Sequence, residues 1–298
     1  MKIGYVYIAI TAFIFSTMEI VGKSIAQDIN PFQLTFLRFL IGGIVLLPFA
    51  IKEMRKREIK FAKEDLIYFT IMGLLFVVVS MSFFQFAVLY TKASIVAVVF
   101  STNPIFTVPL AYFILKEKVD KLTILSIALS LVGMLFILNP LHMHIDNGVK
   151  GIVLAFLAAL MFSLYSILGK KKIEKYGGLA FNCWTFLIGD LILLVFIIIY
   201  KIPIIQNVSS SNMMQILYMG VFVTGLGYVL YFKAMEETSA ILASTVFFIK
   251  PALAPILALI ILKEKVHMNT TLGIVCILIG SYSTILSKKI QNAKKIQA

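Results

Sequence analysis

The sequence predicts an all-α integral membrane protein in which ten transmembrane helices form two inverted repeats of five helices each. Three observations predict this fold: the composition, the spacing of the apolar stretches and a similarity between the two halves of the chain. Hydrophobic residues make up 60% of the 298 residues and charged residues 14%, and the mean hydropathy is +0.99. A soluble protein of this length could not bury so much apolar surface, so we expect lipid to cover part of it.

Apolar stretches bounded by charges, glycine or proline define the spans, because a bilayer core about 30 Å thick takes roughly 20 residues of helix. In the first half we predict helices at 4–23, 31–51, 66–90, 93–115 and 120–139. In the second half we predict them at 149–169, 179–200, 212–234, 239–262 and 268–287. The first stretch contains Glu19 and lacks a small-x-small cleavage site, which favours a span over a signal peptide.

The basic residues of the loops predict the orientation of these spans. With the N-terminus inside, the cytoplasmic segments contain nineteen Lys and Arg and the opposite segments six, while Arg38 and Lys250 lie within spans. We therefore expect a multi-pass protein of the cell membrane with both termini in the cytoplasm. The same distribution makes the net charge of +13 a sign of topology, and we expect no nucleic-acid partner.

The two halves match each other without gaps at a constant shift of 147 residues. Phe15–Lys23 shares five of nine residues with Phe162–Lys170, and the Lys-Glu-Lys-Val sequence at 116–119 recurs at 263–266. We predict two repeats, residues 1–147 and 148–298, within one membrane domain. Because each repeat holds an odd number of spans, the second enters the membrane from the opposite side.

Two matched prolines suggest where the chemistry lies, since inverted-repeat transporters bind substrate near the midplane on interrupted helices. Pro104 and Pro251 occupy equivalent positions, and each removes a backbone donor and frees a carbonyl about one turn earlier. Asn103 precedes the first and Lys250 precedes the second. We interpret both prolines as gating kinks; the alternative is that they merely bend their helices, as many transmembrane prolines do.

Ionisable residues within spans should face a partner, water or the protein interior, because each is costly in lipid. Lys250 at midspan could bind a carboxylate or phosphate, and Glu19 could bind an amine or exchange a proton, so together they suit a zwitterion. The alternative is that Glu19 and Lys250 neutralise each other as a structural pair. For Arg38 and Asp190 we favour a packing or topological role.

Further candidate substrate-binding residues accompany Glu19, Asn103 and Lys250 at the expected depth, and aromatic faces among them could line a pocket for an amphipathic or cationic substrate. They are Gln85, Tyr165, Tyr228, Tyr231 and Phe247. Small residues on the fifth and tenth spans would also permit close helix contact between two copies of the chain, so a homodimer is left open.

Catalysis and metal binding find little support in the sequence. The three histidines lie in loops, and no zinc-protease, nucleophile-elbow or phosphate-loop motif occurs. Cys183 and Cys276 both fall in apolar stretches, away from other metal ligands. We expect a protein that is not an enzyme and has neither a metal nor a cofactor, with coupling to a proton or sodium gradient left open.

Motifs in both halves resemble the EamA-type, ten-span branch of the drug/metabolite transporter superfamily over essentially the whole chain. In the first half these are Leu37-Arg38-Phe39 followed by Pro48, Thr91-Lys92-Ala93-Ser94 leading to Asn103-Pro104, and Lys116-Glu117-Lys118. In the second half they are Tyr231-Phe232-Lys233-Ala234, Thr238-Ser239-Ala240, Lys250-Pro251 and Lys263-Glu264-Lys265.

This resemblance implies a central cavity lined by the first, third, fourth, sixth, eighth and ninth spans, with alternating access by rocking of helix bundles. Similar proteins move amino acids, other metabolites, nucleotide sugars or drugs, often outward. The chain departs from the family pattern at Lys250, where many members carry Glu, and at Phe15-Ser16, where many carry Trp-Gly. Both departures fall in the cavity region, so the resemblance does not carry over a substrate.

Together these observations predict a secondary transporter, working as an exporter, of small polar or zwitterionic metabolites such as amino acids. The alternative is a passive channel or pore for small solutes. A flux assay against concentration separates them, because only a transporter saturates.

Overall fold

The computed structural model describes residues 2–60, 62–138, 147–263, 268–269, 271–280 and 282–283. These residues form helices, turns and short loops without strands, and eight helices are long and apolar enough to cross a membrane. They are Ile3–Ile25, Pro31–Lys56, Lys63–Tyr90, Ala93–Leu115, Gly148–Tyr176, Gly178–Ile199, Ser210–Glu237 and Ala240–Ile261. Two shorter apolar helices, Lys121–Gly133 and Thr271–Gly280, lie where the fifth and tenth spans are predicted. The all-α membrane fold is thus confirmed, although the ends of those two predicted spans lie outside the described residues.

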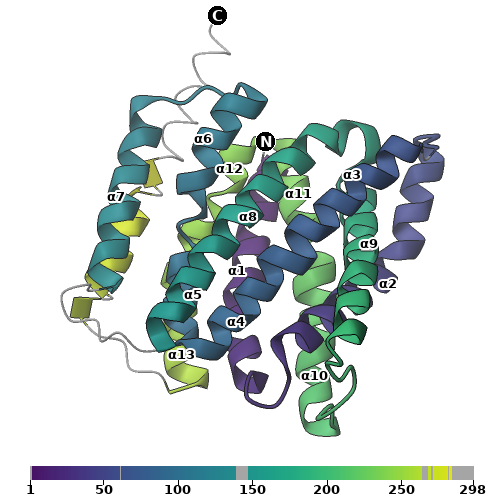
Figure 1. Ribbon diagram of the computed structural model, residues 1–298. Coiled ribbons are helices and arrows are strands. Elements are labelled where there is room, and N and C mark those ends of the chain that lie inside the picture. Colours follow the sequence, from purple (N-terminus) through teal and green to yellow (C-terminus); the bar gives the residue numbers. More distant parts are fainter. Residues whose placement is uncertain are drawn as a thin grey trace, which may run out of the picture.

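The first half begins with two uninterrupted helices, and its third and fourth spans are each built from several pieces. The elements are α1 (Lys2–Ile25), α2 (Pro31–Lys56), α3 (Lys63–Gly73), η1 (Leu74–Met81), α4 (Ser82–Tyr90), α5 (Ala93–Phe100), α6 (Asn103–Leu115) and α7 (Lys121–Leu138). In Figure 1, α7 lies at one edge of the bundle and α2 at the opposite edge, with α1 and α8 between them.

The second half repeats this pattern of two continuous helices followed by two composite spans. Its labelled elements are α8 (Asn147–Tyr176), α9 (Gly178–Ile199), α10 (Ser210–Tyr218), η3 (Met219–Gly227), α11 (Tyr228–Glu237), α12 (Ala240–Ala243) and α13 (Val246–Ile261). Local details recur as well: Asp65 accepts a hydrogen bond from the amide of Ala62, and its counterpart Asn212 accepts one from Ser209. Lys116 and its counterpart Lys263 both have positive φ, near 57°, where their helices end.

Both composite third spans contain a π-helical segment at the same place in the repeat. Segment η1 covers 74–81, and η3 covers 219–227, which is within two residues of 74–81 shifted by 147. The last residue of η1, Met81, accepts a hydrogen bond from the hydroxyl of Tyr228, its own counterpart, at 3.3 Å. Two equivalent residues can touch only where the halves meet, so this contact marks the pseudo-twofold axis. π-Helical turns are frequent at functional sites.

The fourth and ninth spans are interrupted, but the interruptions lie at Ser-Thr pairs. In the first half α5 ends before Ser101 and Thr102, and α6 then begins at Asn103 and Pro104. In the second half the break lies at Ser244 and Thr245, and Pro251 sits well inside α13. The expectation of a break at the second proline is therefore off by about two turns, because these hydroxyls bond to carbonyls three or four residues back and compete with the helical pattern.

Symmetric contacts across the halves fix their relative direction. Lys23 at the end of α1 donates to the carbonyl of Val88 at 2.9 Å, and its counterpart Lys170 at the end of α8 donates to Met235. The start of α8 lies against the end of α4, because a Cβ on Gly151 would come within 2.9 Å of Thr91. The end of α1 and the start of α8 therefore share one end of the molecule, so the two halves run in opposite directions.

Close helix crossings at equivalent glycines hold the halves together near mid-bundle. A Cβ on Gly73 of α3 would come within 2.6 Å of the Cα atom of Gly189 in α9. The symmetric crossing joins Gly42 of α2 to η3, where a Cβ would meet the carbonyl oxygen of Gly220 at 3.0 Å. Backbones that approach this closely gain contact without a hydrophobic driving force, as small residues allow in membranes.

Candidate functional site

A buried ion pair links the first helix of one half to the ninth span of the other. Lys250 of α13 donates a hydrogen bond through Nζ to Oε1 of Glu19 on α1, and both side chains are fully buried. The second carboxylate oxygen of Glu19 has no hydrogen-bond partner. The ammonium of Lys250 also lies 5.0 Å from the ring centre of Phe100 and 5.6 Å from that of Phe84. The pair is thus enclosed by rings rather than by water.

A third charge lies beside this pair. Arg38 of α2 is fully buried and interacts electrostatically with Glu19, Lys250 and the hydroxyl of Tyr228. Its guanidinium carbon stands 4.8 Å from the ring centre of Phe39, and none of its three nitrogens has a hydrogen-bond partner. The sequence singled Arg38 out as a charge within a span but favoured a packing role for it.

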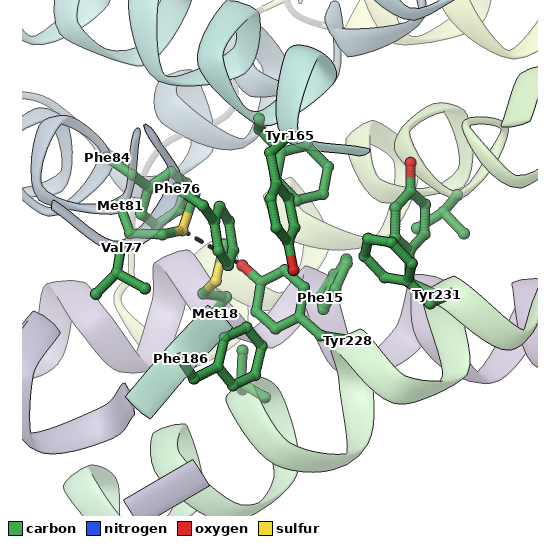
Figure 2. Close-up of a cluster of buried hydrophobic side chains, with 14 of the residues drawn as sticks. Phe15, Met18, Phe76, Val77, Met81, Phe84, Tyr165, Phe186, Tyr228 and Tyr231 are labelled. Carbon is green, nitrogen blue, oxygen red and sulfur yellow. Dashed lines mark hydrogen bonds between the residues drawn. The ribbon is translucent and has the colours of Figure 1, made fainter. Parts of the chain in front are cut away.

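An aromatic cluster contacts these charges through Phe39, Phe84 and Phe100, and Figure 2 shows part of the cluster. Tyr165 of α8 stacks on Phe76 of η1 with ring centres 4.0 Å apart, and Tyr228 meets the edge of Phe76 at 5.1 Å. Tyr231 and Phe247 lie 5.7 Å apart in the same cluster. All four predicted aromatic residues therefore share one buried cluster at the junction of the two halves. Its other rings include Phe15, Phe39, Phe100, Phe162 and Phe186.

The two remaining polar candidates lie in different surroundings. Asn103 donates through Nδ2 to the hydroxyl of Ser163 on α8 at 2.6 Å and accepts a bond from Thr107 at 2.9 Å. It therefore faces α8, whereas Lys250 faces α1. Gln85 of α4 lies against Gly22 of α1, one turn beyond Glu19, and its Nε2 atom has no partner.

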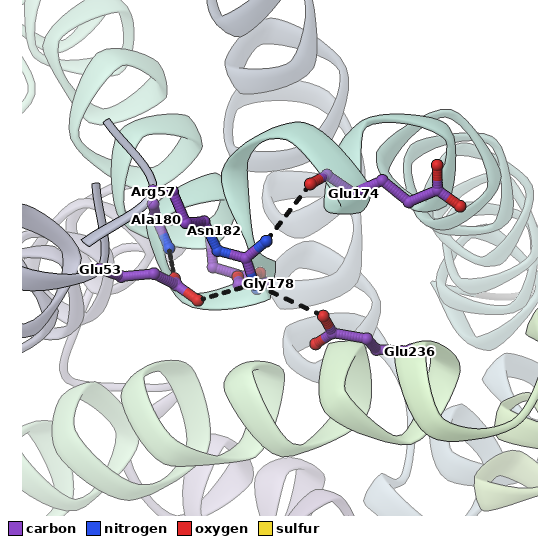
Figure 3. A network of polar contacts seen from close by, with 7 residues as sticks. All are labelled: Glu53, Arg57, Glu174, Gly178, Ala180, Asn182 and Glu236. Atoms are coloured by element: carbon purple, nitrogen blue, oxygen red, sulfur yellow. Dashed lines mark hydrogen bonds and ion pairs between the residues drawn. The ribbon is translucent and has the colours of Figure 1, made fainter. Parts of the chain in front are cut away.

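Charged contacts gather at one end of the molecule, which we call the basic end and define by residues 53–60, 62–65, 116–120, 174–180 and 233–241. Arg57 lies 3.6 Å from Glu236 and 3.5 Å from Glu53, and it donates to the carbonyl of Glu174 (Figure 3). The carboxylate of Glu53 in turn accepts the amide of Ala180 at the start of α9.

Two further contacts reinforce the basic end. Lys175 of α8 pairs with Asp65 of α3 at 2.7 Å. Glu117, after α6, accepts the amides of Ala240 and Ile241 at the start of α12, at 2.8 and 3.2 Å. A carboxylate at the N-terminus of a helix satisfies free amides and complements the helix dipole. Of the ion pairs among the described residues, all but the Glu19–Lys250 pair lie at this end.

At the opposite end, side-chain donors bind backbone carbonyls, and the ion pairs of the described residues do not reach it. Gln33 donates to the carbonyls of Ile204 and Gln206 at 2.9 and 2.8 Å, and Asn207 donates to the carbonyl of Asp28 at 3.0 Å. These contacts border a pocket of about 280 Å³ between the loops at 26–31 and 203–207. The two ends are therefore closed by contacts of different chemistry.

A profile of the EamA-like transporter family matches the chain twice, at residues 2–139 and 149–286. The chain belongs to the EamA-like transporter family. The two matches are offset by the same 147 residues that relate the two halves of the sequence. Membership makes it a multi-pass membrane transporter by family, and the EamA resemblance seen in the motifs is confirmed.

Individual relatives span nearly the same length. An uncharacterized transporter of Clostridium kluyveri is 46% identical over 303 residues, covering 99% of this chain and 97% of that protein. The uncharacterized transporter YoaV of Bacillus subtilis is 26% identical over 257 residues, covering 86% and 87%. A crystal structure of a protein aligns with a TM-score of 0.76 at 16% identity, covering 97% of this chain and 99% of that one. That structural likeness supports the fold alone.

Several residues of the site were not singled out from sequence for this role. Arg38 was noticed but assigned elsewhere, because sequence alone does not show that its guanidinium lacks a partner. Met81 carried no signal apart from its position, 147 residues before Tyr228. The Ser-Thr pairs did carry one: a Ser-Thr dipeptide occurs in both the fourth and the ninth span, directly before Asn103 and directly before Val246.

Proposed function

We propose that this family member is a secondary transporter that exports small polar or zwitterionic metabolites, amino acids among them, by alternating access. The observation that carries the proposal is the Glu19–Lys250 pair, which joins the first helix of one inverted repeat to the ninth span across the junction of the halves. Buried ion pairs rarely stabilise a fold, because desolvating two charges offsets their attraction. Charges kept within transmembrane helices mark substrate or ion pathways by default.

The arrangement of the halves supports the alternating-access part of the proposal. In inverted-repeat transporters, one bundle rocks against the other around a site near the midplane. The aromatic cluster and the ion pair at the junction of the halves are the candidates for that site, and contacts that would break for access lie at both ends. Opening one end would separate Arg57 from Glu236, and opening the other would separate Gln33 from Ile204. If the two ends cannot open at the same time, the site is reached from only one side of the membrane at a time.

Reconstituted protein provides the test. Uptake of labelled amino acids and related metabolites into proteoliposomes, with and without imposed proton or sodium gradients, should saturate with concentration and accelerate when unlabelled substrate is present on the other side. Lys250→Ala should lower this flux at least about tenfold, as expected for a buried charge that contacts substrate. Lys201→Ala, an exposed lysine at the opposite end, is the matched control.

Two results would contradict the proposal in different ways. Flux that rises linearly with concentration and shows no acceleration by trans substrate would point to a passive pore. Normal transport by Lys250→Ala, in protein that elutes as wild type on gel filtration, would make the pair structural and remove the basis for placing the site there.

A further inference from the structure

We infer that Arg38 is a substrate-binding residue and that the substrate is a small organic monoanion, a carboxylate on an apolar body, held between Arg38, Lys250 and the aromatic cluster. This inference rests on the proposed transport function and replaces its substrate class, polar or zwitterionic metabolites, with organic monoanions. It begins from a charge count at the centre of the bundle. Glu19 carries one negative charge, while Lys250 and Arg38 carry two positive charges, so the three fully buried groups leave one surplus positive charge.

No other acid among the described residues balances that surplus. The ion pairs there include Glu19 with Lys250 but none with Arg38. Asp190 on α9 is another buried acid. Both of its oxygens lack a hydrogen-bond partner, so it does not bind the guanidinium of Arg38. The electrostatic partners of Arg38 are Tyr228, Glu19 and Lys250. An anion from outside the chain would complete the site.

A purely structural role explains the geometry of Arg38 poorly. Buried charges are normally paired and hydrogen-bonded, because an uncompensated one costs far more than a neutral side chain of the same volume. A structural arginine would be expected to bind carbonyls or a carboxylate, yet none of the three buried nitrogens of Arg38 does so, and the side chain beside them is the neutral hydroxyl of Tyr228. Functional sites are the places where proteins keep such locally unfavourable groups.

The chemistry of the site selects the ligand class. The guanidinium is a planar fork that binds a carboxylate through two parallel hydrogen bonds, and it stays charged when buried. A monoanion cancels the single surplus charge. A zwitterion or an amine does not, and a phosphate monoester, with about 1.5 to 2 negative charges, would exceed it. The surrounding rings of Phe15, Phe76 and Tyr228 favour an apolar or aromatic body on the same molecule.

Two matched ligand series test the inference with the full-length purified protein. The aromatic series is hydrocinnamate, phenylalanine and phenethylamine, and the aliphatic series is hexanoate, norleucine and pentylamine. Each series keeps one body and changes its head from anion to zwitterion to cation. Affinities come from the ligand-dependent rise in Tm, which follows binding to the folded state. Transport of the same six compounds is measured in proteoliposomes.

The expected result has two parts. Wild-type protein should bind the anion of at least one series at least about tenfold more tightly than the zwitterion with the same body. Arg38→Gln should weaken that anion at least about 30-fold, which corresponds to losing one partner of a buried charge-assisted contact, and should leave the zwitterion nearly unchanged. Arg55→Gln is the matched control, because it removes an exposed arginine from the end of the same helix, α2.

Arg38→Met is a second variant, used in case Arg38→Gln does not fold. Its independent readout is the Tm of the ligand-free protein. Replacing an unpartnered buried guanidinium with an apolar side chain of similar length should raise the Tm of the ligand-free protein while abolishing the shift caused by the anion. If Arg38 instead has a structural role, Arg38→Met should lower the Tm and keep the anion shift. That pattern would overturn the inference.

The remaining outcomes separate this inference from the proposed function. Wild-type protein that prefers the zwitterion or the amine in both series, or Arg38→Gln that keeps its affinity for the anion, would overturn the inference and leave the transporter proposal standing. Wild-type protein that neither binds nor moves any of the six compounds would overturn the inference, and the proposed function would then be decided by the wider uptake panel of amino acids and related metabolites.

Discussion

The three clustered charges Glu19, Arg38 and Lys250 have neutral residues at all of their pseudo-twofold counterparts. The counterparts of Glu19, Arg38 and Lys250 at a shift of 147 are Ser166, Thr185 and Asn103. Asn103 shows the neutral arrangement, in which Ser163 and Thr107 satisfy the amide without any charge. Because the three symmetry-related positions pack without ions, packing alone does not require the charges of Glu19, Arg38 and Lys250. The asymmetry favours a role in binding.

The Glu19–Lys250 pair yields a stability prediction at this scale. Glu19→Gln leaves two buried cations without an anion, and breaking a buried pair in this way costs about 3–5 kcal/mol, so we expect a clear drop in Tm. The double variant Glu19→Gln/Lys250→Met removes both charges and should recover most of that stability. Its transport should stay lost, because the binding groups are gone. Thermal unfolding in detergent and flux in proteoliposomes measure the two effects.

A double variant as unstable as Glu19→Gln would contradict this prediction, since it would mean that the charges hold the fold. Recovery of transport together with stability would contradict the second part of the prediction, because the charges would then not be needed for binding. Lys201→Ala serves as the control for nonspecific effects of losing a lysine.

Elements of the fold differ in how far the sequence could predict them. The bounds of α5–α6 follow from a polar break at Thr91-Lys92 and a charged end at Lys116, and they coincide with the predicted 93–115. Breaks within the spans were assigned to prolines, whereas the structure places the second at Ser244-Thr245. A transmembrane helix can continue through a proline when neighbouring groups satisfy the backbone carbonyl that the proline leaves without a hydrogen bond. A helix break at Ser or Thr is harder to recognise from sequence, because most hydroxyls that bond to a carbonyl three or four residues earlier leave the helix intact.

Thr70 illustrates that last point and provides a control. Its hydroxyl donates to the carbonyl of Leu66 four residues back at 2.8 Å, yet α3 continues through it. What differs at Ser244 and Thr245 is that two consecutive hydroxyls bond to carbonyls three residues back, which matches the tighter turn between α12 and α13. At the first break two consecutive hydroxyls also bond to the backbone, Ser101 four residues back and Thr102 three residues back.

Removing those hydroxyls should therefore join α12 to α13. In Ser244→Ala/Thr245→Val we expect slower hydrogen exchange at the amides of residues 246–249, because regular helical bonds replace the irregular turn. Transport should fall several-fold, since the break precedes the helix that carries Lys250. Mass-spectrometric exchange and flux in proteoliposomes measure these changes. Thr70→Val should alter neither, and unchanged exchange in the double variant would show that the break has another cause.

The whole molecule is closed at both ends, but by different interactions. At the basic end the contacts are ion pairs and helix caps, and at the opposite end the ammonium of Lys23 and the amides of Gln33 and Asn207 donate to backbone carbonyls. The twofold relation of the halves was predictable from the 147-residue repeat. The closure of the ends was not, because Arg57 and Glu236 come from different halves, and their non-equivalent positions leave no trace in the repeat.

Arg57 joins three elements of the basic end, so it should bias the balance between open and closed states. Arg57→Gln removes the contacts to Glu53, Glu236 and the carbonyl of Glu174. The side chain of Arg57 is 34% exposed, and exposed pairs are worth about 0.2–1 kcal/mol each. We therefore expect a shift of about 2- to 5-fold toward the state open at this end.

Labelling of a buried cysteine measures that shift. Ser166→Cys places a thiol on α8 at a fully buried position beside the aromatic cluster, and a soluble maleimide reaches it only when one end opens. Adding Arg57→Gln should raise the labelling rate from the basic side by the same factor, and raised salt should do so in wild-type background because exposed pairs are screened. Arg55→Gln, two residues earlier, should leave the rate unchanged. Equal rates in all three proteins would mean that the basic end is held by packing and helix caps, and Arg57 would then have no part in access.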